Sequence, residues 1–244
     1  SYIYFLILIS NLLNKNYDQR YLPNILKRIN FKEIINNNSF DLIDGNSGLL
    51  ISIVRYYEKF KNDESYKILN EYGMQIFNII KYKFEKNKDF FLPGFSHGIA
   101  GIAYALTLFN FYIKDKYIDQ LILILIKFEN KNFYSDNTNN WINTSKRKKF
   151  YHDKNQTSWC HGSLGVALSR VGVFKYSNNS SIRDIANLDI QRFININNLN
   201  IKNFTLCCGQ ISSFRLIDYF DKNQGTIKNK LKLRFIKDLR SKLK

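Results

Sequence analysis

The sequence has few residues that interrupt helices, with two prolines and eleven glycines among 244 residues. This scarcity disfavours a turn-rich β architecture and favours long helices. Hydrophobic residues make up 45% of the chain and aromatic residues 16%, so a sizeable core can form and global disorder is disfavoured. The composition therefore predicts a folded and largely helical chain.

Cysteine is also scarce, and the three present are Cys160, Cys207 and Cys208. An odd number with two adjacent members makes a poor disulfide framework. Thiols of this kind are more typical of a reduced compartment, where they bind metals or react. We therefore expect a cytoplasmic protein.

No hydrophobic run is long enough to cross a membrane without including a charge. Residues 2–9 are apolar, but no positively charged segment precedes them and they are too few to span a bilayer. We interpret them as part of a buried helix. The chain starts at Ser1 and its single methionine is Met74, so we expect a fragment or a processed product.

Acidic residues are few, with 20 Asp and Glu against 37 Lys and Arg, so the net charge is +17. Such a balance can indicate nucleic acid, an anionic membrane or an acidic peptide as partner. The lysines are scattered rather than clustered, so we favour a solvated basic surface and expect no nucleic acid partner. A basic helical-repeat nucleic-acid binder is the alternative, and it leaves the cysteines unexplained. Peripheral association with a membrane or a transporter stays open.

A repeated unit organises the chain. Each unit is a Gly-x-x-Gly turn, an apolar helix with small residues, a loop and a more amphipathic helix, recurring roughly every 45–65 residues. This predicts helical hairpins in a ring or solenoid, with the helices after the glycines inside and the amphipathic ones outside. The expected helices include 2–14, 22–36, one from about 49, 64–84, one from about 102, 114–128, one from about 166, 180–196, one after Gly209, and 226–242.

Residues 129–157 form the least helical stretch of the predicted structure. They are rich in Asn and Lys, contain Trp141 and lead directly into Cys160. A loop of that length in a compact domain is usually functional or mobile.

All three cysteines lie just ahead of an inner helix, at equivalent places in the repeat. In a ring these places meet at one end. Three sulfurs there would form a three-thiolate zinc site that leaves the fourth tetrahedral position open, as in catalytic zinc centres. The alternative is three buried cysteines that act as small hydrophobic residues.

Two of the three histidines, His97 and His161, also lie on the repeat signature. We favour His97 for acid–base chemistry because it lies on a different unit from the cysteines. Asp41 or Asp44, on the first unit, could orient an imidazole. Either could instead be an ordinary anion at a helix N-terminus, and the chemistry alone leaves both readings open.

Three sets of residues carry a resemblance: Gly94-Phe95-Ser96-His97-Gly98, Trp159-Cys160-His161-Gly162 and Cys207-Cys208-Gly209. Together with the first unit they resemble the lanthionine synthetase C-like family, over about residues 40–219. The Trp-Cys-His-Gly and Cys-Cys-Gly forms look most like the cyclase domain of bifunctional LanM-type lantibiotic synthetases. On this resemblance, residues 1–244 form a single cyclase-like domain.

The resemblance implies an α/α-toroid, here expected to be incomplete at both ends, with a zinc ion at one end. It implies an enzyme that adds a peptide cysteine to dehydroalanine or dehydrobutyrine in a dehydrated precursor peptide, giving lanthionine or methyllanthionine. By motif match, Cys160, Cys207 and Cys208 would bind the zinc. His97 would protonate the enolate, Asp41 is favoured over Asp44, and His161 has a supporting role.

The sequence departs from the family pattern in three ways. Gln210-Ile211-Ser212-Ser213 stands where the family usually has a second glycine, and Gln156 is the nearest counterpart of an arginine that some members carry. No dehydratase domain is present, so a dehydratase domain or partner would have to make the dehydro residues. The Ser212-Ser213 departure and the short length of the chain favour the alternative of a non-catalytic or decayed toroid that binds a peptide or a small thiol.

Overall fold

The computed structural model describes residues 39–142, 158–160 and 162–194. The helices expected at 2–14, 22–36, after Gly209 and at 226–242 lie outside these ranges, as do Cys207, Cys208, His161 and His152. The described elements are α4 (Asn46–Phe60), α5 (Asp63–Lys86), η1 (Lys88–Phe90), α6 (Ile99–Ile113), α7 (Lys116–Phe133), β1 (Tyr134–Ser135), β2 (Asn140–Trp141), α8 (Ser163–Tyr176) and α9 (Ser180–Ile194).

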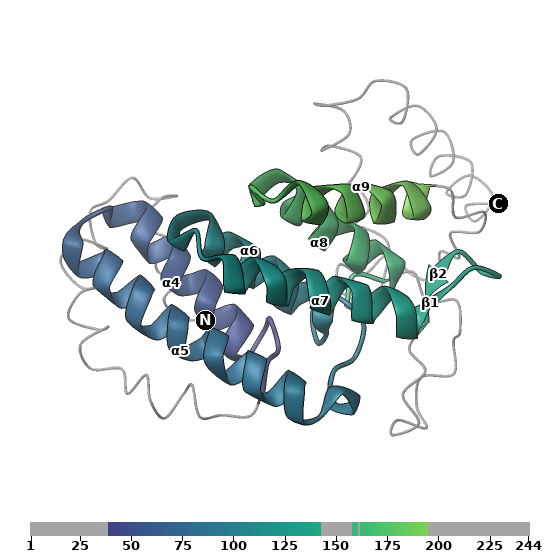
Figure 1. Ribbon diagram of the computed structural model, residues 1–244, viewed down its shortest axis with the longest axis horizontal. Helices are drawn as coiled ribbons and strands as arrows, with labels where there is room; N and C mark the ends of the chain where they lie inside the picture. The colour runs from purple at the N-terminus through teal and green to yellow at the C-terminus, as the bar shows by residue number, and fades with distance from the viewer. Residues whose placement is uncertain (1–38, 143–157, 161, 195–244) are drawn as a thin grey trace, which may run out of the picture.

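The six described helices form three hairpins that lie side by side in chain order (Figure 1). Each inner helix packs on its own outer helix, so the pairs are α4 with α5, α6 with α7, and α8 with α9. The inner helix α6 also packs against α4 on one side and α8 on the other. The prediction of an all-α, two-layered toroid architecture is confirmed.

Burial explains the two layers. The inner helix α6 is buried along nearly its whole length, and its small residues Ala100, Gly101 and Ala103 let neighbouring helices approach. The hydroxyl of Ser169 on α8 donates to the Ala100 carbonyl at 2.6 Å. The outer helix α7 instead buries a stripe at helical spacing, comprising Ile118, Leu121, Ile122, Leu125 and Ile126.

Short and long connections alternate between the two ends of the hairpins. Each inner helix passes to its outer helix through two or three residues, and Lys61 and Lys114 end α4 and α6 in the left-handed conformation. Asn62 and Asp115 then cap the N-termini of α5 and α7 through their side chains. The long connections all lie at the opposite end, ahead of the inner helices, where loops are free to carry function.

The segments just before the inner helices share one backbone arrangement, and we call them corners. The first corner is residues 41–45, the second is 94–98 and the third is 158–162 without the undescribed residue 161. In each, the amide of a glycine in the first helical turn donates to the carbonyl seven residues earlier: Gly48 to Asp41 (3.3 Å), Gly101 to Gly94 (3.4 Å) and Gly165 to Ser158 (3.3 Å).

These glycines are required by space. A Cβ at Gly48, Gly101 or Gly165 would lie 2.1, 2.1 or 1.9 Å from the carbonyl oxygen six residues earlier. The chain folds back onto the first turn of each inner helix too closely for any side chain. The Gly-x-x-Gly signature therefore marks a close backbone contact as well as a helix start.

The predicted loop at 129–157 is corrected in its first part. Helix α7 continues to Phe133. Its last turn keeps the two-sided pattern of an outer helix, since Glu129 is buried while Lys131 and Asn132 are exposed. The chain then forms a two-residue antiparallel ladder that pairs Tyr134 with Trp141. Trp141 is buried, and its indole nitrogen donates to the Asn130 side chain at 2.9 Å. Residues 143–157 lie outside the described ranges.

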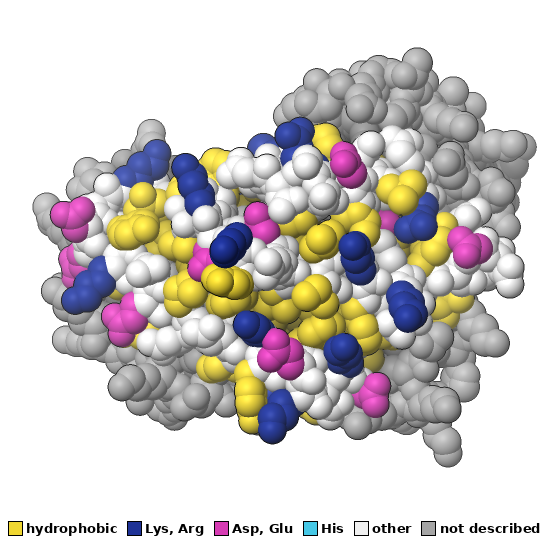
Figure 2. Space-filling view, viewed as in Figure 1, with side chains coloured by type: hydrophobic (Ala, Val, Ile, Leu, Met, Phe, Trp, Pro, Cys, Tyr) yellow, Lys and Arg dark blue, Asp and Glu magenta, His cyan; other side chains and the backbone are white. Residues whose placement is uncertain are grey.

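Within the described ranges, no helix combines the length and apolarity needed to cross a membrane. On the face drawn in Figure 2, lysines and arginines are interspersed with hydrophobic and acidic side chains and do not gather in one patch. This distribution agrees with a solvated basic surface, while the expectation of no nucleic acid partner stays a prediction.

We expect Gly165→Ala to lower the free energy of unfolding by about 2 kcal/mol or more, because the new methyl group meets the Trp159 backbone carbonyl. The matched control is Gly172→Ala on the same helix, where the methyl group meets the ring of Tyr104, a side chain that can move. Both changes gain a similar helix propensity of about 1 kcal/mol. Urea unfolding of both variants checks this, and equal losses would contradict the backbone explanation.

Tyr112 gives a pH prediction. Burial raises the pKa of Tyr112 to about 12, and a hydrogen bond from its hydroxyl to Glu58 at 2.9 Å adds to the rise. Because the folded state favours the neutral phenol, the stability that this group contributes is complete below about pH 10 and is lost as the pH rises through about 12.

The difference between the phenolate absorbance titrations of the wild type and Tyr112→Phe should therefore have its midpoint near the raised pKa. Glu58→Gln should move that midpoint down, since it removes the negative charge beside the phenol while an amide oxygen remains to accept the hydrogen bond. A wild-type midpoint at the ordinary tyrosine value of about 10 would refute the assignment.

Candidate functional site

The three corners meet at one end of the described structure. Successive inner helices run in the same direction because an antiparallel outer helix joins each pair, so their N-termini gather together. The Leu42 amide in the first corner donates to the Ser96 carbonyl in the second at 2.8 Å. The Phe95 ring in the second corner meets the Trp159 ring in the third edge-on, with centroids 5.6 Å apart. Residues far apart in sequence are thus brought together here.

His97 and Asp41 form an ion pair across the first two corners. His97 Nδ1 bonds Asp41 Oδ2, and the side chains are 40% and 14% exposed. The other carboxylate oxygen of Asp41 accepts from the Ile43 amide at 2.6 Å, which fixes the carboxylate in its own turn. The contact with Asp41 uses Nδ1, so a proton transfer to or from a substrate would involve the other ring nitrogen, Nε2.

The structure separates the two aspartates that the chemistry left equal. Asp44 is exposed and no described hydrogen bond or ion pair involves its side chain. Asp41 has the imidazole contact, so it is the residue that orients His97. The distinction comes from the turn in the first corner, where the Asp41 side chain folds toward the second corner.

Cys160 lies in the third corner, two residues before the N-cap Gly162 of α8, and is 1% exposed. The Ser158 hydroxyl lies 3.5 Å from its sulfur. The positive end of a helix favours a thiolate at such a place, so the donor is chemically suited to zinc. In the other corners the same register position, two residues before the glycine, holds Ile43 and Ser96.

Among the described residues, no three His, Cys, Asp or Glu side chains group closely enough to hold a metal ion. The predicted set also needs Cys207 and Cys208, which lie outside the described ranges together with His161. The three-sulfur zinc site therefore stays a prediction. In the sequence, Cys207 precedes Gly209 by the same two positions that separate Cys160 from Gly162.

A buried cluster of charges behind the corners escaped the sequence analysis. Arg170 on α8 bonds Glu129 on α7 at 2.5 Å and Asp189 on α9 at 2.8 Å, and all three side chains are fully buried. Burial raises the pKa of Glu129, against the opposing effect of Arg170. Burial alone would lower the pKa of Arg170, but the two carboxylates outweigh it and the pKa is raised. The sequence did contain one sign of this cluster, because Glu129 continues the apolar stripe of α7 at helical spacing. The predicted helix ended at residue 128, so Glu129 was assigned to the following loop.

Two buried hydroxyl groups lie at the end of the structure where the corners meet. Ser96 Oγ, beside His97, and Ser163 Oγ, at the first position of α8, have no hydrogen-bond partner in the described part of the chain. An unsatisfied buried hydroxyl costs about 1–3 kcal/mol. The corners therefore contain polar atoms to which a water molecule or a polar substrate group could bond.

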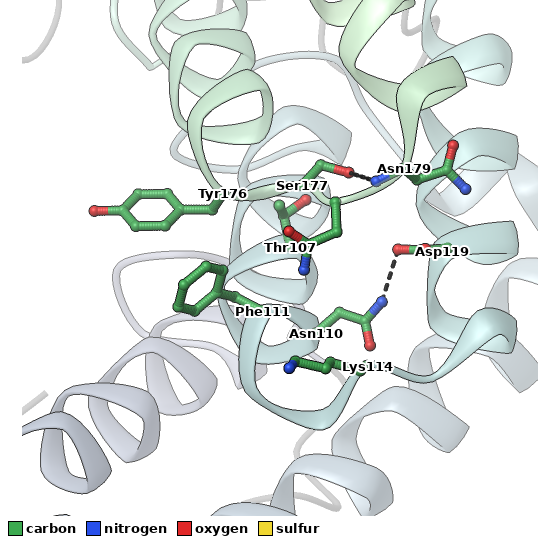
Figure 3. A pocket seen from close by; sticks show the side chains of 9 residues that line it. Thr107, Asn110, Phe111, Lys114, Asp119, Tyr176, Ser177 and Asn179 are labelled. Atoms are coloured by element: carbon green, nitrogen blue, oxygen red, sulfur yellow. Dashed lines mark hydrogen bonds between the residues drawn. The ribbon is translucent and has the colours of Figure 1, made fainter.

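A separate pocket lies at the opposite end of the hairpins, with a volume of about 310 Å³ (Figure 3). Its walls include Thr107, Asn110 and Lys114 from the end of α6 and Ser177 from the turn after α8. Asn110 is about 18 Å along α6 from Gly98. Its side chain already bonds Asp119 at 2.7 Å, as Figure 3 shows. This pocket is distinct from the corners and contains neither His97 nor Cys160.

The model of the lanthionine synthetase C-like protein family matches residues 1–243. The chain therefore belongs to the lanthionine synthetase C-like family, which is associated with lanthionine synthetase cyclase activity. No curated protein matches the chain.

We expect Asp41→Asn to release His97, since an amide cannot form the same ion pair, whereas the Ile43 amide keeps an oxygen acceptor. Stability should fall by about 1 kcal/mol or less because the pair is partly exposed. The His97 ring signals in a ¹⁵N–¹H nuclear magnetic resonance spectrum should change. Asp44→Asn is the control and should leave them unchanged. Equal changes in the two variants would count against the pairing.

Proposed function

We propose that this chain is a zinc-dependent cyclase of the LanM type that forms lanthionine or methyllanthionine rings. Its substrate would be a dehydrated precursor peptide containing dehydroalanine or dehydrobutyrine and a free cysteine. The observation that carries the proposal is the Asp41–His97 pair at the corner adjacent to the one that holds Cys160. Membership in the family supports the same chemistry.

The reaction needs one C–S bond and one proton. The substrate cysteine loses its proton and its sulfur adds to the β-carbon of the dehydro residue, so the C=C electron pair moves onto the α-carbon as an enolate. His97, held at Nδ1 by Asp41, delivers a proton from Nε2 to that carbon. One proton leaves the thiol and one reaches the α-carbon, so the mass of the peptide is unchanged.

Cys160, with Cys207 and Cys208, would hold the zinc ion. When bound, zinc supplies a Lewis acid that lowers the pKa of a substrate thiol, so that the nucleophile forms near neutral pH. The burial of Cys160 supports this role because it keeps the sulfur away from bulk water. His161, next in the chain, would support the site rather than donate the proton.

The positions of the glycines explain why substrate groups could meet there. The repeated close contact at Gly48, Gly101 and Gly165 draws each corner onto its helix, so the corner residues reach toward one end. A dehydratase, as a fused domain or as a partner protein, would supply the dehydro residues.

Metal analysis tests the zinc centre. Protein purified without chelator should contain about one zinc per chain, and Cys160→Ala should lose most of it because one of three thiolates is removed. Ser158→Ala alters the neighbouring hydroxyl but no ligand, so it should keep its zinc. A zinc-free wild type, or full zinc in Cys160→Ala, would overturn the proposed centre.

Incubation with a dehydrated precursor peptide tests the activity. The wild type should remove free thiol from the peptide without a change in mass. His97→Asn should lower kcat by about 10²- to 10⁴-fold, the usual contribution of general acid–base catalysis, with its zinc content unchanged.

The second candidate function is a toroid that binds a peptide or a small thiol without catalysis. The departure at Gln210-Ile211-Ser212-Ser213 favours it. Zinc and peptide binding with no loss of free thiol would support this candidate over the cyclase.

A further inference from the structure

The second corner, which carries His97, depends on a side chain from α7, the outer helix of its own hairpin. Gly94 has a φ of 111°, a conformation that only glycine adopts readily. Its amide donates to the carboxylate of Glu129 on α7 at 3.1 Å, and that carboxylate is fully buried. Three residues after Gly94 the chain reaches His97. The buried carboxylate thus holds the start of the segment that presents the imidazole.

The carboxylate of Glu129 is itself held from a second side. Its other oxygen accepts from Arg170 Nη2 at 2.5 Å, and Arg170 lies on α8, the helix that follows Cys160. Arg170 also donates to Asp189, which accepts in addition from Asn130 and from Arg192. One connected network therefore links the His97 corner to α7, α8 and α9.

We infer that Glu129 is a positioning residue for His97, because it fixes the second corner relative to the helix that follows Cys160. This inference rests on the proposed function for its effect on rate. Asp41 orients the imidazole ring from the front, through a partly exposed contact. Glu129 fixes the backbone from behind, through Gly94, in a site closed to water. The first contact acts on the imidazole ring and the second on the backbone that carries it.

The chemistry of the pair suits such a role. A charged acceptor gives the Gly94 amide a stronger hydrogen bond than a neutral one would. Arg170 balances the charge, so a carboxylate can remain inside the fold. In the other corners the residue equivalent to Gly94 is Asp41 or Ser158, and no described carboxylate from another helix bonds its amide. The reinforcement belongs to the corner with the proposed proton donor.

The test compares two double variants that both remove the buried ion pair. Glu129→Gln with Arg170→Met keeps an oxygen acceptor for the Gly94 amide, whereas Glu129→Leu with Arg170→Met removes it. Asp189 keeps Asn130 and Arg192 as partners in both. Replacing a buried ion pair by apolar groups is often tolerated, so both variants should fold. A control removes a partly exposed ion pair elsewhere, by Glu58→Leu with Arg55→Met.

Hydrogen exchange measures the positioning without reference to activity. The amides of residues 94–101 should exchange about tenfold faster in the leucine variant than in the glutamine variant, since one hydrogen bond is lost. Exchange in α5 should be the same in both. Equal exchange at 94–101 in the two double variants, or an equal increase in all helices, would overturn the inference.

Kinetics measures the consequence. In the leucine variant kcat should fall on the order of 10²-fold with KM nearly unchanged, because a small displacement of a catalytic group has that effect. The glutamine variant and the Glu58 control should keep kcat within about threefold. Equal kcat values in the two double variants would refute the positioning role. A wild type without cyclisation would refute the proposed function alone, while hydrogen exchange still decides whether Glu129 holds the corner.

Discussion

The close contact between a backbone carbonyl and a glycine in the first turn of each inner helix underlies the rest of the structure. It occurs at Gly48, Gly101 and Gly165, each time with the carbonyl six residues earlier. A side chain at any of these positions would push the preceding segment away from the helix. The contact fixes the direction in which each segment leaves the helix and so gathers the three corners at one end. The Asp41–His97 pair can form only because two such corners meet.

Behind the corners, three charged side chains are buried, which is energetically unfavourable without partners. Glu129, Arg170 and Asp189 have no exposed surface, and a core of apolar residues could fill the same space. The network is therefore weak evidence of stability and better evidence of a requirement for one defined arrangement. The hairpin β1–β2 joins the same network, because Asn130 bonds both Trp141 and Asp189. The short ladder is thereby anchored at the point where α7 ends.

Much of the architecture was accessible from sequence because it depends on local and periodic signals. The glycine pairs marked the inner helices, and the apolar stripe of α7 marked an outer one. His97 was singled out by its place in the repeat. The chemistry of the residues left Asp41 and Asp44 equal, and only the motif match to the family favoured Asp41, because the choice depends on how one turn directs a side chain toward a different corner. The Glu129–Arg170 pair joins residues 41 positions apart, so no local sequence pattern predicts this ion pair. The short ladder at Trp141 was also missed, since its Asn- and Lys-rich surroundings are typical of a loop.

The common register of the corners has a consequence for how such a protein can change. One position before the N-cap glycine the chain has Asp44 in the first corner and His97 in the second, and the sequence has His161 and Cys208 at the same offset from Gly162 and Gly209. The backbone contacts that define a corner involve the glycines and carbonyls and leave this side chain out. A mutation at that offset therefore exchanges one functional group for another on an unchanged frame. Acid, base and metal ligand become interchangeable at a small cost in folding, so the ring can acquire or lose a chemistry through single substitutions.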